Sequence, residues 1–142
     1  MRLFDTLDHI AIVVRDTEEA LTFYRDTLRL PFLFSEVLAD QSVRLTHLDL
    51  GACHLQLVEP LRDDHPLAEV LRQHGEALHH VCFKVDDVVR AIDELPARGL
   101  ESRDAQPRSG PRGRLAVFIK AAGTRGVQFE LTSERRARGA RE

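Results

Sequence analysis

The chain has 142 residues, of which 43% are hydrophobic and 30% are charged, and its net charge is -3. Such a composition is typical of a globular domain that buries a core, and the small negative charge argues against a nucleic-acid partner. Apolar runs fall short of the roughly 20 residues that span a bilayer, and Met1–Asp5 lacks the apolar core of a signal peptide, so we expect a cytoplasmic protein without a membrane partner.

The first half of the chain predicts one helix among four strands. Asp16 is a helix cap, and the two glutamates that follow it favour the positive end of the helix dipole, so a helix is predicted over 17–27. Apolar or alternating runs predict the strands, and the last two form a β-hairpin around Gly51. These strands cover residues 9–14, 32–37, 43–50 and 54–58.

The second half predicts the same order of elements. A linker over 61–77 contains a short helix with Pro66 in its first turn. A helix over 88–98 follows the next strand and ends at Gly99, and a polar loop covers 104–114. The predicted strands cover residues 80–85, 100–103, 115–120 and 127–132, and the charged tail, 134–142, is expected to be disordered.

The two halves repeat one short sequence. Leu7–Thr17 aligns without a gap with Leu78–Val88, which places His9 on His80 and an aspartate on an aspartate beyond each strand. We therefore predict an α+β fold of two tandem βαβββ modules. The first module covers 1–60, the linker 61–77 and the second module 78–133.

Polar residues recur at matching places of the two modules. Gln56 lies 47 residues after His9, and Glu130 lies 50 residues after His80 (56 − 9 and 130 − 80), each inside an apolar strand. Burial of a carboxylate without a partner costs several kcal/mol, so these positions need an explanation. If each module forms a curved sheet and the sheets face each other, the four side chains can converge. Alternatively, each is a hydrogen-bonded or solvent-facing strand residue.

Two imidazoles, one carboxamide and one carboxylate form a mixed nitrogen and oxygen donor set. Closed structural zinc sites usually use thiolates or more histidines. The mixed set better suits a six-coordinate divalent ion with two positions left for water or substrate. The remaining histidines have no counterpart in the other module and are interpreted as surface or packing residues: His47, His54, His65, His74 and His79. Cys82 is interpreted as a small buried apolar residue.

Four stretches resemble the vicinal oxygen chelate (glyoxalase/bleomycin-resistance-like) superfamily, and within it the methylmalonyl-CoA epimerases. They are Leu7–Ile12, Pro60–Leu61 with His65–Ala68, Leu78–Asp87, and the Gly-Val-x-x-Glu-Leu ending at 126–131. The resemblance implies a cup-shaped mixed sheet, an incomplete barrel with the helices outside, around a divalent metal. It also implies a homodimer and an acyl-CoA substrate.

The resemblance further implies roles for individual residues. The metal ligands would be His9, Gln56, His80 and Glu130, with Co²⁺ as the first expectation and Mn²⁺, Ni²⁺, Zn²⁺ or Mg²⁺ as others. Glu130 would also be one of two acid/base carboxylates that epimerise C2 through a metal-stabilised enolate. The second carboxylate lies in a Pro-Glu-x-Gly-Val type of loop, where this chain has Asp40, one methylene shorter, and Ser42 in place of glycine.

Two other functions remain open from the sequence. One is a glyoxalase I-like isomerase (lactoylglutathione lyase), against which Gln56 argues mildly because a second carboxylate ligand is missing. The other is a non-catalytic small-molecule-binding or resistance protein that needs no metal. The arginine-containing loop 103–114 suits phosphate as well as solvent, so no binding residue is assigned there.

Overall fold

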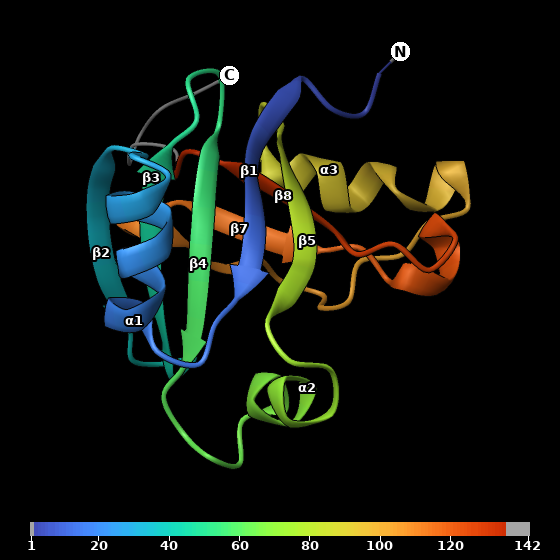
Figure 1. Cartoon of the computed structure of the whole chain (residues 1–142). Helices are drawn as coiled ribbons and strands as arrows, with labels where there is room; N and C mark the ends of the chain where they lie inside the picture. Colours follow the sequence, from blue (N-terminus) through green and yellow to red (C-terminus); the bar gives the residue numbers. More distant parts are fainter. Residues whose placement is uncertain (1, 136–142) are drawn as a thin grey trace. The chain divides into compact units, whose positions relative to one another are not determined.

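The computed structural model describes residues 2–135 and has an α+β fold (Figure 1). In each half one helical segment follows the first strand and three more strands follow it, as predicted. The strands are β1 (Thr6–Val13), β2 (Phe32–Leu38), β3 (Val43–Asp49), β4 (His54–Pro60), β5 (Ala77–Lys84), β6 (Arg108–Ser109), β7 (Leu115–Phe118) and β8 (Phe129–Ser133). The α-helices are α1 (Thr17–Leu21), α2 (Pro66–His74) and α3 (Val88–Glu94). A π-helical segment, η1 (Thr22–Thr27), continues α1, and the 3₁₀ turns are η2 (Pro96–Arg98), η3 (Pro111–Gly113) and η4 (Ala121–Thr124).

The chain divides into two compact units. The first unit is Leu7–Val81, and the second combines Met1–Thr6 with the chain from Cys82 onward. The strand order is β2-β3-β4-β1-β5 in the first unit and β5-β8-β7-β6 in the second, so β5 contributes to both. Because β1 and β4 are parallel while the hairpins are antiparallel, the sheet is mixed. The predicted α+β class and the βαβββ order of each half are confirmed.

The sheet of the first unit has two different faces. Ile10 and Ile12 of β1 pack with Leu21 of α1, Leu55 and Leu57 in one apolar cluster. The alternate residues of β1 are His9, Ala11 and Val13, which are all buried and point to the opposite face. His9 therefore lies on the face of this sheet that α1 does not cover.

The first helical segment covers the predicted range with two hydrogen-bond patterns. The Asp16 side chain accepts a hydrogen bond from the Glu19 N–H at 2.9 Å, as expected of a helix cap. After Leu21 the backbone widens into a π-type turn, in which the Leu28 N–H donates to the Phe23 carbonyl. Arg29, with φ of 64°, ends the segment.

The second unit has its own core, which includes residues from the start of the chain. Val88 and Ala91 of α3, with Leu95 just after it, pack with Val117 of β7 and Leu131 of β8. Phe4 stacks on Phe83 of β5 with ring centroids 4.2 Å apart. The segment before β1 is therefore part of the apolar core of the second unit.

The predicted strand over 100–103 is wrong. Ser102 forms an isolated bridge with Ile119, just beyond the end of β7, and the pairing does not extend into a ladder. The strand of this region lies instead within the predicted polar loop, where Arg108 pairs with Ala116 of β7. Of the predicted tail, residues 136–142 lie outside the described residues.

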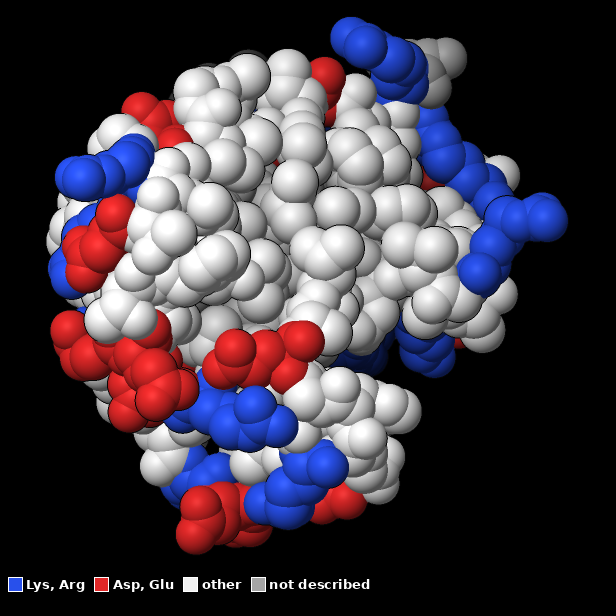
Figure 2. Space-filling view, in the orientation of Figure 1, with Lys and Arg blue, Asp and Glu red and all other residues white. Residues whose placement is uncertain are grey.

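Among the described residues, no helix is long and apolar enough to cross a membrane. Figure 2 shows basic and acidic side chains side by side over α2 and the segment before it, at the lower edge of the view. They include the exposed ion pairs Arg62–Asp64 and Arg72–Glu69. The predicted helix of the linker is thus present as α2, and its charged face is solvated.

Candidate metal-binding site

Two buried histidines of the first unit point their ring nitrogens at each other. His9 on β1 and His80 on β5 are 2% and 8% exposed. Their Nε2 atoms lie 3.4 Å apart. Metal–imidazole bonds are about 2.1 Å long, so two nitrogens at this separation can bind one ion. The pair that the sequence repeat predicted is thus brought together.

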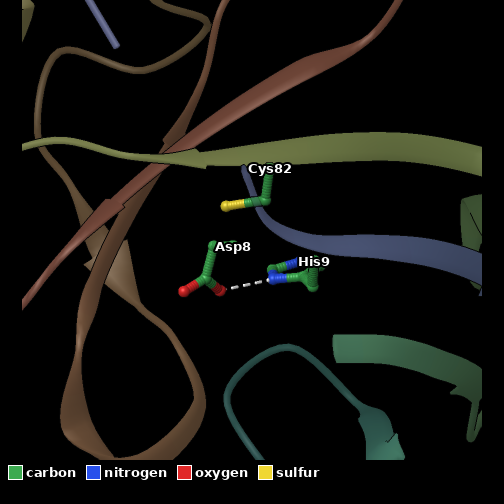
Figure 3. A group of neighbouring side chains, drawn as sticks. All are labelled: Asp8, His9 and Cys82. Carbon is green, nitrogen blue, oxygen red and sulfur yellow. Dashed lines mark hydrogen bonds and ion pairs between the residues drawn. The ribbon is translucent and has the colours of Figure 1, made fainter. Parts of the chain in front are cut away.

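The other ring nitrogen of each histidine has a partner. His9 Nδ1 lies 2.8 Å from Asp8 Oδ2, a hydrogen bond drawn as the dashed line in Figure 3. His80 Nδ1 lies 2.8 Å from His79 Nδ1. A hydrogen bond at Nδ1 fixes the ring orientation and the tautomer of a metal-binding histidine and directs Nε2 to the ion. The aspartate therefore leaves His9 Nε2 available for coordination, and His80 Nε2 is available in the tautomer in which His80 Nδ1 donates to His79.

Gln56 on β4 lies on the same face of the first unit as His9. The parallel ladder pairs Ala11 with Gln56 and His9 with His54, and paired residues point to the same face of a sheet. Gln56 is 3% exposed, and its Nε2 lies 3.1 Å from Nε2 of His47. The structure thus places three of the four predicted ligands, His9, Gln56 and His80, in one unit. Of these, His9 and His80 lie within hydrogen-bond distance of each other.

His47 and His54 belong to the polar network of this face. His47 on β3 is 2% exposed, stacks on Phe34 with centroids 4.5 Å apart, and has Nδ1 2.9 Å from Nδ1 of His54. Of the two interpretations, surface or packing residue, the buried and stacked ring of His47 fits the second, and its hydrogen bonds to Gln56 and His54 were not predicted. The hairpin register pairs His47 with Gln56, and this partner could have been found by counting outward from the turn at Gly51.

Glu130, the fourth predicted ligand, lies on β8 of the second unit. Its side chain is buried, and Oε2 accepts a hydrogen bond from Nη2 of Arg108 at 2.7 Å. The guanidinium of Arg108 also lies over the ring of Phe118, 4.5 Å from its centroid. A charge-assisted hydrogen bond of this length holds the carboxylate in one orientation.

The remaining residues that the sequence singled out lie at the surface or in turns, except Cys82. Asp40, the predicted second base, is exposed in the turn between β2 and β3. Ser42 closes this turn with φ of 53°, the left-handed conformation in which glycine is unstrained. His65 caps α2 and His74 is exposed at its end, as the surface interpretation expected. Cys82 is buried, as predicted.

Comparisons with known proteins agree with this arrangement. A family described as the glyoxalase/bleomycin resistance protein/dioxygenase superfamily matches residues 8–118. The uncharacterized protein YqjC of Bacillus subtilis is 34% identical over 88% of this chain and 89% of its own. The ethylmalonyl-CoA/methylmalonyl-CoA epimerase of Cereibacter sphaeroides is 29% identical over 88% of this chain and 95% of its own.

Among the similar solved structures, one resembles this chain in both fold and sequence. It is a variant of Streptomyces coelicolor methylmalonyl-CoA epimerase in complex with 2-nitronate-propionyl-CoA. Its TM-score is 0.87 at 30% sequence identity, and the match covers 94% of this chain and 99% of that one. The similarity therefore extends over nearly the full length of both proteins.

Proposed function

Because the chain belongs to the glyoxalase/bleomycin resistance protein/dioxygenase superfamily, we propose that it epimerises a 2-methylmalonyl-CoA-type thioester at C2. The observation that carries the proposal is the pair of buried imidazoles, His9 and His80, with their Nε2 atoms 3.4 Å apart. Relatives that cover nearly the whole chain are epimerases of methylmalonyl-CoA and ethylmalonyl-CoA, which supports an acyl-CoA substrate.

The proposed ligands of a divalent cation are His9, Gln56, His80 and Glu130, with Co²⁺ as the first expectation. The donor atoms fit such an ion, since imidazole, carboxamide and carboxylate together suit a six-coordinate divalent metal. When bound, the cation would stabilise the negative charge that develops on the thioester oxygen after C2 loses its proton. Gln56 adds no negative charge, so the metal site keeps a higher net positive charge and stabilises that oxygen more strongly.

Inversion at C2 requires one proton acceptor and one proton donor on opposite faces of the substrate. Glu130 is the proposed group on one face and Asp40 the proposed group on the other. General acid–base catalysis typically contributes 10²- to 10⁴-fold in rate. The hydrogen bond from Arg108 supports the role of Glu130, because it fixes the direction in which the carboxylate points.

The test starts from a single C2 epimer of methylmalonyl-CoA, or of ethylmalonyl-CoA, incubated with protein loaded with Co²⁺. The expected result is conversion to an equal mixture of epimers, and Asp40→Asn slows the conversion if Asp40 is the second base. Turnover of the methylglyoxal–glutathione hemithioacetal without epimerisation would favour a glyoxalase I-like isomerase instead. Tight small-molecule binding by metal-free protein, with neither reaction, would favour a binding protein.

We also propose that the protein is a homodimer, as the family resemblance implies. Light scattering at several protein concentrations measures the mass in solution. A mass of one chain, 16.1 kDa, at all concentrations would contradict a stable dimer.

A further inference from the structure

Three polar side chains form a line of hydrogen bonds across the hairpin of β3 and β4. Gln56 Nε2 lies 3.1 Å from His47 Nε2, and His47 Nδ1 lies 2.9 Å from His54 Nδ1. We propose that His47 is a positioning residue that orients the carboxamide of Gln56 so that the oxygen, not the NH₂ group, is presented to a cation. The inference rests on the metal site of the proposed function and adds to it a residue that is not itself a ligand.

The types of donor and acceptor give the line a direction. The Nε2 atom of glutamine only donates, so Nε2 of His47 must accept and carries no proton. The proton of a neutral imidazole is then on Nδ1, which donates to Nδ1 of His54. His47 is therefore predicted to be the Nδ1–H tautomer.

The surroundings of His47 prevent the ring from turning. It is 2% exposed and lies parallel to the ring of Phe34, with 18° between the two planes. In the ladder it stands directly opposite Gln56, where the Cβ atoms of paired strands are about 5 Å apart. A ring that is fixed in this way can select one of the two orientations of the neighbouring amide.

A carboxamide needs this selection because its two ends have nearly the same shape. Rotation by half a turn exchanges the oxygen, which can bind a cation, with the NH₂ group, which cannot. With the NH₂ group bound to His47, the oxygen is the end that remains to coordinate an ion. A phenylalanine at this position would fill the same space and stack on Phe34. It has no nitrogen that accepts a hydrogen bond, so the amide of Gln56 could take either orientation.

The first part of the test is the tautomer of His47 in metal-free protein. Nitrogen-15 NMR above the ordinary histidine pKa of about 6.5 distinguishes a protonated from an unprotonated ring nitrogen. The expected result is an unprotonated Nε2 and a protonated Nδ1 in His47. A proton on Nε2 would overturn the inference, because the neighbouring end of Gln56 would then have to be the oxygen.

The second part compares the affinity for Co²⁺ by calorimetry. His47→Phe should weaken binding about 10- to 100-fold, as is typical when a residue that orients a ligand is lost. His47→Gln, whose carbonyl oxygen can accept the same hydrogen bond, should restore most of the affinity. His74→Phe at the exposed end of α2 is the matched control and should bind like the unaltered protein.

The outcomes separate this inference from the metal site itself. Equal affinity of His47→Phe and unaltered protein would overturn the role of His47 and leave the metal site standing. No binding by unaltered protein would overturn the metal site and this inference with it. Thermal unfolding shows whether His47→Phe is folded. If it is not, the tautomer of His47 in the unaltered protein and the Co²⁺ affinity of His47→Gln test the inference: a proton on Nδ1 and near-normal affinity support it, and a proton on Nε2 overturns it.

Discussion

The hairpins β3–β4 and β7–β8 each carry one predicted ligand in their second strand, yet surround it differently. Gln56 stands opposite His47 in the first hairpin, and Glu130 stands opposite Phe118 in the second. His47 is hydrogen-bonded to its partner directly. Phe118 instead supports Arg108, which reaches Glu130 from β6.

The difference follows the charge of the candidate ligand. A neutral amide needs a neighbour that accepts from its NH₂ group, and an imidazole does so without adding charge. A buried carboxylate needs a cation or several donors, because its desolvation costs several kcal/mol. Both halves thus contain a hairpin with a predicted ligand in its second strand, while the side chains around the ligand differ with its charge.

The largest effect is expected from Glu130→Gln, which makes the second hairpin neutral like the first. Loss of the carboxylate removes a proposed base, so exchange of the C2 proton should fall at least 10²- to 10⁴-fold. The rate is measured by NMR with methylmalonyl-CoA in deuterated water. Glu101→Gln at an exposed position is the matched control, and an unchanged rate in Glu130→Gln would remove Glu130 from the reaction.

Arg108→Leu should destabilise the protein by about 2 kcal/mol, because it leaves the buried carboxylate of Glu130 without its cation. This value is below that for a fully buried pair, since the side chain of Arg108 is 26% exposed. The free energy of unfolding is measured with denaturant. In a double-mutant cycle with Glu130→Gln, strictly additive effects would show that the two side chains do not stabilise each other.

Gln56→Glu gives the first hairpin the charge of the second without its arginine. A second carboxylate ligand would lower the net positive charge of the proposed metal site, so the ion would stabilise the enolate oxygen less. Exchange of the C2 proton should then slow about tenfold, which corresponds to about 1.4 kcal/mol of barrier. Gln73→Glu on the exposed side of α2 is the control. Faster exchange in Gln56→Glu would contradict the role of Gln56 as a neutral ligand.

The smallest effect is expected from Arg72→Ala, which breaks an exposed ion pair and so provides the contrast to Arg108. The hydrogen bond from Arg72, and then that from Gln73, holds the pKa of Glu69 below its ordinary value of 4.5. Its stabilising contribution is therefore present above pH 4.5 and is lost as the pH falls through the lowered pKa. In Arg72→Ala, NMR titration should show the pKa of Glu69 rising, with little change in thermal unfolding.

Local patterns in the sequence predicted most of the fold and part of the site. The gap-free repeat gave β1, β5, and the pairing of His9 with His80, because strands and caps are encoded by neighbouring residues. Contacts that depend on tertiary packing were not predictable in this way. Phe4 packs on Phe83, far along the chain, and β6 forms in a segment of polar character because β7 provides a partner. The contact between His47 and Gln56 is of a different kind, because the hairpin register predicts it only when residues are counted across the turn from both strands.

Deuterium incorporation at C2 of methylmalonyl-CoA in deuterated water tests the central claim most directly. The unaltered protein is compared after treatment with a chelator and after reloading with Co²⁺. The proposed function predicts rapid incorporation by the reloaded protein, little by the chelated protein, and little by His9→Ala and His80→Ala under either condition. Absence of incorporation by the reloaded, folded protein would contradict an epimerase that acts through a metal-stabilised enolate.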